Sequence, residues 1–157
     1  MFGYREFRPG QAEVISAVLA GRDTLAVMPT GGGKSVCYQV PAMARERGLT
    51  VVVSPLLALM KDQVDTLRQA GVAAAAINST VARDEQAAVM EQAQSGDLCL
   101  LYVAPERFSD GGFMAGLRRC QVGLLAIDEA HCISEWGHDF RPSYRDLGGV
   151  RAGIGNP

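Results

Sequence analysis

Short apolar runs alternate along the chain with longer stretches of helical periodicity. The apolar runs cover residues 24–28, 50–54, 72–77, 98–103 and 122–127. The helical stretches cover residues 11–21, 34–47, 56–70, 81–94 and about 112–117. Most of the apolar runs lack the alternation of a strand with one face in solvent, which indicates burial on both faces. Buried strands that alternate with helices predict an α/β fold, with a mostly parallel central sheet of about five strands and helices on both faces.

The stretch 81–94 carries the signals of a helix start. Ser79 or Thr80 is the expected N-cap, because a side-chain oxygen there can accept a hydrogen bond from a free backbone N–H of the first turn. Asp84 and Glu85 place negative charge in that turn, where the helix dipole favours it.

In a parallel sheet, ligands bind beyond the carboxyl ends of the strands. The loops that follow Met28, Ser54, Val103 and Ile127 are therefore where we expect the functional residues.

Composition limits the class of protein. The chain has 157 residues and is 48% hydrophobic, enough for one domain with a buried core. Its longest stretch without charge, residues 69–82, is too short and too polar to span a membrane. The cysteines lack paired zinc-ligand spacing, so we expect reduced thiols in an intracellular protein, cytoplasmic or, in a eukaryote, nuclear. A net charge of −2 argues against a basic coat for nucleic acid.

A glycine-rich segment, Met28–Ser35, lies between the first apolar run and a helical stretch. Its glycines allow successive backbone N–H groups to face a phosphate at a helix N-terminus. Lys34 can bridge the outer phosphates and Ser35 can bind Mg²⁺. Met28 stands where the general signature has glycine, and a glycine-rich turn with a chance lysine is the structural alternative. The residues expected to bind the nucleotide here are Thr30, Gly31, Gly32, Gly33, Lys34 and Ser35.

Two carboxylates, Asp128 and Glu129, follow the apolar run 122–127 directly. Asp128 is expected to hold Mg²⁺ together with Ser35, and Glu129 to orient or deprotonate the attacking water. A polar helix start is the alternative reading of the pair by itself. Together with the phosphate loop, the pair predicts an ATPase that uses ATP and Mg²⁺.

The segment Asp128-Glu129-Ala130-His131 resembles the DEAH-type box of helicases, and the residues that follow it, 132–142, resemble the RecQ family of DNA helicases. Three further segments carry the same resemblance: residues 7–11, residues 53–56 together with 59–63, and residues 104–108. The resemblance spans nearly the whole chain. It implies a RecA-like P-loop NTPase fold in which Lys34, Asp128, Glu129 and His131 serve catalysis.

The resemblance also implies an adenine site near the N-terminus. Tyr4, Arg8 and Gln11 combine an aromatic ring, a guanidinium plane and an amide, which can sandwich a purine and bond its edge. The alternative is an N-terminal helix on which these side chains only pack or lie in solvent.

The segment 131–144 is rich in aromatic and cationic side chains, which are suited to stacking bases and binding phosphates. A hydrophobic plug under a long loop is the alternative, and some of the aromatic residues could pack inward. In RecQ helicases the resembling loop couples DNA binding to hydrolysis. The residues expected to contact DNA here are Trp136, His138, Phe140 and Arg141, next to Glu129 and His131.

Two other strand ends, at Ser54-Pro55 and at Ala104–Arg107, resemble the edges that track the DNA backbone in related translocases. Backbone donors at these turns need no net positive charge. Ordinary turns, with a local ion pair between Glu106 and Arg107, are the alternative. Ser54, Pro55 and Arg107 are the DNA contacts expected at these edges.

The resemblance maps residues 1–157 to the N-terminal RecA-like lobe of such a helicase, before the second lobe that supplies an arginine finger. We expect the isolated lobe to bind ATP, to hydrolyse it weakly, and to unwind DNA poorly or not at all. Its expected partners are single-stranded and partly duplex DNA and the second lobe, with no membrane. A P-loop nucleotide phosphotransferase and a non-catalytic, ATP-gated nucleic-acid-binding module are the alternatives.

Overall fold

The computed structural model describes residues 6–29, 31–45, 48–134 and 141–157. The chain forms two compact units, Met1–Glu46 and Arg47–Pro157, which are described separately below. The predictions for Tyr4, Thr30, Trp136, His138 and Phe140 lie outside the described residues.

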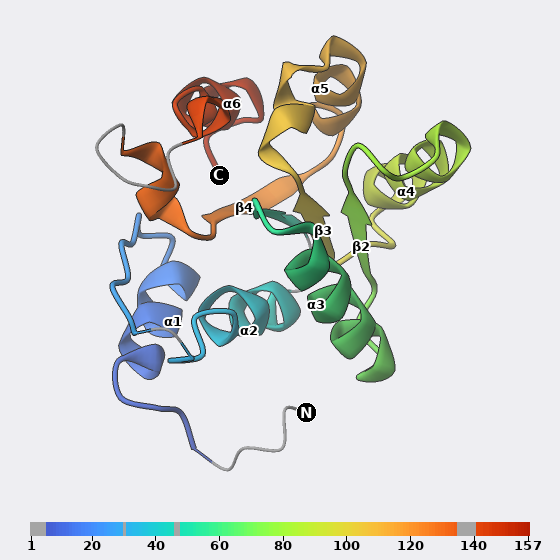
Figure 1. Cartoon of the computed structure of the whole chain (residues 1–157). Helices are drawn as coiled ribbons and strands as arrows, with labels where there is room; N and C mark the ends of the chain where they lie inside the picture. The colour runs from blue at the N-terminus through green and yellow to red at the C-terminus, as the bar shows by residue number, and fades with distance from the viewer. Residues whose placement is uncertain (1–5, 30, 46–47, 135–140) are drawn as a thin grey trace. The chain divides into compact units, whose positions relative to one another are not determined.

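The larger unit is built on a four-stranded sheet with the order β2-β3-β1-β4 (Figure 1). Every pair of neighbouring strands is parallel. The strands are β1 (Leu49–Val53), β2 (Ala74–Ile77), β3 (Leu100–Val103) and β4 (Val122–Ile127). Each strand coincides with one of the apolar runs, so the parallel sheet is confirmed.

Helices cover both faces of this sheet. One face carries the main core, in which Val51 and Val53 of β1 join residues of α4 (Arg83–Ser95), α5 (Gly111–Leu117) and α6 (Leu147–Gly153). The opposite face is covered by α3 (Leu57–Gln69), whose buried side chains are Met60, Val64 and Leu67 (Figure 1). All five residues of β1 are buried, because a strand in the middle of the sheet is covered on both faces.

Short 3₁₀ turns follow two of the strands. They are η1 (Pro105–Ser109) after β3 and η2 (Ala130–Ile133) after β4, and a third turn, η3 (Pro142–Tyr144), precedes α6. In the described part of the chain, the cysteines form no disulfide bond with one another. Among the described residues, no helix is both long and apolar enough to cross a membrane.

The smaller unit contains α1 (Gln11–Leu19) and α2 (Val36–Ala44), which pack against each other. The prediction of a buried strand at residues 24–28 is wrong for this structure. The segment forms no strand, and Leu25 and Val27 are 83% and 91% exposed. A strand requires a hydrogen-bonded neighbour, and no described segment pairs with this one. The apolar pattern of residues 24–28 could not show that a neighbouring strand is missing among the described residues.

The predicted start of α4 is also corrected. Its N-cap is Ala82, without a side-chain hydrogen bond, rather than Ser79 or Thr80. Thr80 instead donates its N–H and its hydroxyl to Asn78 Oδ1, at 2.8 and 2.7 Å. Asn78 thus forms the local turn that follows β2, and this turn uses the residues that were expected to cap the helix.

Candidate functional site: a phosphate loop and a carboxylate pair

Three consecutive glycines shape the loop before α2, for two different reasons. Gly31 and Gly33 have left-handed backbones, with φ of 74° and 78°. A Cβ on Gly32 would lie 2.8 Å from the carbonyl oxygen of Pro29, which accepts the Gly32 N–H at 2.9 Å. A side chain is thus excluded at Gly31 and Gly33 by the left-handed backbone, and at Gly32 by the close approach of the Pro29 carbonyl oxygen.

The loop presents unused donors. Within the described part of the chain, the N–H groups of Gly31, Gly33 and Ser35 donate no hydrogen bond. Ser35 is the N-cap residue of α2, and its side chain forms no capping bond. Free N–H groups at the N-terminus of a nine-residue helix, with Lys34 beside them, suit an anion. The predicted fit to nucleotide phosphates is therefore supported by the backbone itself.

Arg8 and Gln11 contact the phosphate loop directly. Buried Gln11 accepts the Arg8 N–H at Oε1, 2.8 Å away. Its Nε2 donates to the carbonyl oxygens of Gly33 and Gly32 at 3.0 and 3.3 Å, and the Arg8 guanidinium donates to Gly31 O. Both residues thus brace the loop, a role that the sequence did not suggest. Their expected contact with adenine stays a prediction.

Replacing Gly33 by alanine is expected to weaken nucleotide binding about fivefold to thirtyfold, since a left-handed residue with a Cβ costs about 1–2 kcal/mol. The new Cβ would also lie 2.5 Å from Gln11 Nε2 and displace that brace. Titration with a fluorescent ATP analogue measures the change. Gly148→Ala is the matched control, because a Cβ there meets nothing within 4 Å. Equal affinities for the two variants would contradict the expectation.

The carboxylate pair lies at the tip of β4, as predicted. The Asp128 N–H donates to Val53 O of β1 at 2.9 Å, which continues the ladder by one residue. Glu129 then turns the chain with φ 51° and ψ 43°, a left-handed conformation that is rare for a residue with a Cβ. Its N–H donates to Asp128 Oδ1 at 3.0 Å, and its Oε2 lies 3.3 Å from His131 Nδ1. The pair is therefore held by local bonds at a sharp turn.

The strand order brings three strand ends together. Val53 of β1 is in register with Val103 of β3 and with Ile127 of β4. Because neighbouring strands lie about 4.8 Å apart, the residues that follow these three ends line one edge of the sheet. The expected DNA contacts after β1 and β3 thus share an edge with Asp128 and Glu129.

Ser54 itself presents little at this edge. Its side chain is 1% exposed, its hydroxyl has no hydrogen-bond partner among the described residues, and its N–H donates to Val103 O at 3.1 Å. Pro55 is half-buried. The available donors lie just beyond, in the described first turn of α3, where the N–H groups of Leu57, Ala58 and Leu59 donate no hydrogen bond. The contact of Ser54 and Pro55 with DNA stays a prediction, and these neighbours are the better placed donors.

Arg107 is engaged within the protein. It forms an ion pair with Asp110 at 2.8 Å and lies over the ring of Phe113, 5.7 Å from the ring centre. The local ion pair thus involves Asp110 rather than Glu106. Asp110 also caps α5, and the N–H groups of Phe113 and Gly112 lower the pKa of its carboxyl. A phosphate contact by Arg107 would compete with Asp110, and it stays a prediction.

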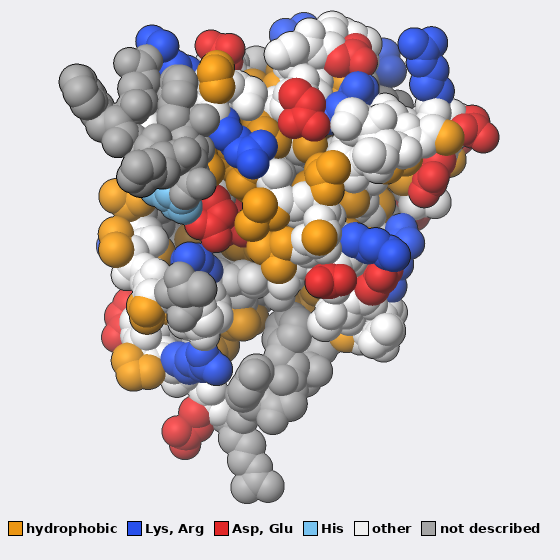
Figure 2. All heavy atoms as spheres, viewed as in Figure 1, with side chains coloured by type: hydrophobic (Ala, Val, Ile, Leu, Met, Phe, Trp, Pro, Cys, Tyr) orange, Lys and Arg blue, Asp and Glu red, His pale blue; other side chains and the backbone are white. Residues whose placement is uncertain are grey.

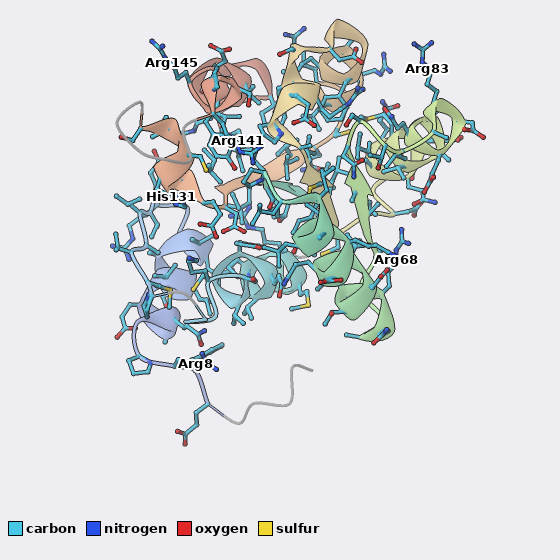
Figure 3. All side chains as sticks on the ribbon, in the orientation of Figure 1. Arg8, Arg68, Arg83, His131, Arg141 and Arg145 are labelled. Atoms are coloured by element: carbon cyan, nitrogen blue, oxygen red, sulfur yellow. The ribbon has the colours of Figure 1, made fainter. Side chains whose placement is uncertain are left out.

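The described ends of the segment 131–144 differ in exposure. His131 and Arg141, both labelled in Figure 3, are exposed, whereas Tyr144 is fully buried. The Arg141 N–H donates to Cys132 O at 2.9 Å and closes the base of the segment. The inward packing expected for some of its aromatic residues is found at Tyr144. On the face drawn in Figure 2, described acidic and basic side chains are interspersed rather than gathered by sign.

The DEAD/DEAH box helicase family matches residues 8–152, and the chain belongs to this family. Within it, the chain is 53% identical over 152 residues to the "ATP-dependent DNA helicase RecQ" of Pasteurella multocida, and 53% identical over 147 residues to the RecQ of Bacillus subtilis. These matches cover 97% and 93% of the chain, so the RecQ resemblance is confirmed. The chain spans only 24% and 25% of those relatives.

The crystal structure of the DUF1998 helicase MrfA has a similar fold, with a TM-score of 0.73 over 97% of this chain and 25% of that one. The sequence identity is 17%, so the likeness concerns the fold alone. It agrees with the predicted RecA-like architecture.

Proposed function

We propose that the chain is the first motor lobe of a RecQ-like DNA helicase, which couples ATP hydrolysis to translocation on single-stranded DNA and to duplex unwinding. The observation that carries the proposal is the carboxylate pair at the tip of β4, on the same sheet edge as the ends of β1 and β3. The braced phosphate loop and the 53% identity to RecQ helicases support it.

The residues divide the chemistry among them. ATP would supply the phosphoanhydride bond that is hydrolysed, and Mg²⁺ would supply the positive charge that neutralises the phosphate oxygens. We assign phosphate binding to the N–H groups of Gly31, Gly33 and Ser35 and to the Lys34 side chain, and metal binding to Ser35 and Asp128. Glu129 orients the attacking water and accepts its proton, with His131 beside it at 3.3 Å.

DNA binding is proposed for the edge that follows β1 and β3 and for the segment after η2. Backbone donors at the start of α3 would contact phosphates, and exposed Arg141 would add a cation. Trp136, His138 and Phe140 are proposed to stack on or contact unpaired bases. The substrate would be single-stranded or partly duplex DNA, in the cytoplasm or, in a eukaryote, the nucleus.

We further propose that a second RecA-like lobe completes the site. An arginine finger contributes about 10³–10⁵ in rate to reactions of this kind, and we assign no described arginine to that role. The isolated 157 residues are therefore expected to bind ATP, to hydrolyse it weakly and not to unwind DNA alone.

The test is the rate of ATP hydrolysis by the full-length protein, with and without a single-stranded oligonucleotide, together with unwinding of a partly duplex DNA. The proposal expects hydrolysis that DNA stimulates and that Trp136→Ala weakens or uncouples from DNA. Hydrolysis that ignores DNA, with phosphate transfer to a second substrate, would identify a phosphotransferase instead. Nucleotide-dependent DNA binding without turnover would identify a binding module.

A further inference from the structure

Tyr144 is a buried tyrosine whose hydroxyl contacts the backbone of the carboxylate pair. Its side chain is 0% exposed, and its hydroxyl donates to Asp128 O at 3.0 Å, across 16 residues of sequence. Burial raises the pKa of this hydroxyl above its usual value.

The bond acts on one particular peptide plane. The plane between Asp128 and Glu129 carries the carbonyl that accepts from Tyr144 and the N–H that donates to Asp128 Oδ1 at 3.0 Å. On the other side, the Asp128 N–H is held by Val53 O at 2.9 Å. The orientation of this plane sets the direction of both carboxylates, since it fixes ψ of Asp128 and φ of Glu129.

The Tyr144 end of this hydrogen bond lies where three short 3₁₀ turns meet. Tyr144 belongs to η3, which packs against both η1 and η2. Its ring lies in the main core, which also contains Cys132 and Leu147. The Arg141 N–H, which begins this end of the segment, donates to Cys132 O. A movement of residues 141–144 would therefore reach Asp128 through one hydrogen bond.

We propose that Tyr144 is a positioning residue, whose hydroxyl fixes the peptide between Asp128 and Glu129 and so makes the direction of the two carboxylates depend on the position of η3. The inference rests on the proposed function, since it assigns those carboxylates to metal and water. It adds a residue that acts through the backbone and contacts neither nucleotide nor DNA.

The test is Tyr144→Phe in the full-length protein, which deletes only the hydroxyl. ATP hydrolysis in the presence of single-stranded DNA is expected to slow about three- to tenfold, the change that one hydrogen bond of ordinary net strength corresponds to. The Mg²⁺ concentration for half-maximal rate is expected to rise by a similar factor. Affinity for a fluorescent ATP analogue without Mg²⁺ should stay within twofold of the wild type.

Two comparisons separate positioning from a structural role. Tyr102→Phe removes the hydroxyl of another fully buried tyrosine, in β3, and is expected to leave the Mg²⁺ dependence unchanged. Tyr144→4-aminophenylalanine keeps a donor in the same place and is expected to restore the rate and the Mg²⁺ dependence.

The inference would be overturned if the Tyr144→Phe protein kept the wild-type rate and the wild-type Mg²⁺ dependence, whatever the melting temperature of that variant. It would also be overturned if 4-aminophenylalanine at position 144 failed to restore the rate and the Mg²⁺ dependence. Failure of the proposed function is distinguishable, because the wild-type protein would then show no hydrolysis that DNA stimulates.

Discussion

Replacement of Lys34 by alanine is expected to slow ATP hydrolysis by about 10²–10³-fold, the loss typical of one positioned donor at a developing charge. Lys34 is the cation that follows Gly33, directly before the N-cap of α2. Alanine keeps the helix but removes the charge expected to bridge the outer phosphates. The rate of phosphate release, measured with saturating ATP and single-stranded DNA, gives the effect.

The matched control is Arg83→Ala, which removes an exposed cation at the start of α4. Its rate is expected to equal that of the wild type, and both variants should melt near the wild-type temperature. A Lys34→Ala protein that is folded and hydrolyses ATP at the wild-type rate would refute the assignment of the phosphate loop.

Glu129→Gln is expected to reduce the rate of hydrolysis by about 10²–10⁴-fold, because general base catalysis contributes about that factor. Glutamine keeps the size and the left-handed backbone of the residue but cannot accept the proton of water. ATP affinity should remain within a few-fold of the wild type, since Glu129 is not assigned to phosphate binding. Single-turnover hydrolysis and an equilibrium titration measure the two quantities separately.

Glu91→Gln is the control for this change, since Glu91 is an exposed carboxylate on α4. It should alter neither quantity. If Glu129→Gln lost ATP affinity and hydrolysis in parallel, its role would be in binding, and the assignment as general base would fail.

The sheet could be predicted from the sequence because each of its strands is a continuous apolar run. Val51, Val52 and Val53 are completely buried in a strand covered on both faces, which is the condition that produces such a run. The run 24–28 is also mostly apolar, but no described strand lies beside it. Apolar composition predicts that a segment can be a strand, whereas pairing depends on the rest of the fold.

The chemical groups of the site were predictable, but the contacts that hold them were not. Lys34, Asp128 and Glu129 stand in short motifs whose spacing is set by local geometry. Gln11 reaches Gly33 across 22 residues and bonds a backbone carbonyl, which any residue type offers. The contact of Tyr144 with Asp128 O is of the same kind. Side-chain bonds to distant backbone atoms leave no pattern in one sequence.

The left-handed backbone of Glu129 has a consequence for engineering. Such a conformation costs a residue with a Cβ about 1–2 kcal/mol, against a net stability of about 5–15 kcal/mol for a domain. Glycine would avoid that cost, so a redesign guided by folding energy alone would favour it at position 129. The same replacement would remove the proposed base. This position is where stability and activity make opposite demands on one residue, and it should be held fixed in any stabilised variant.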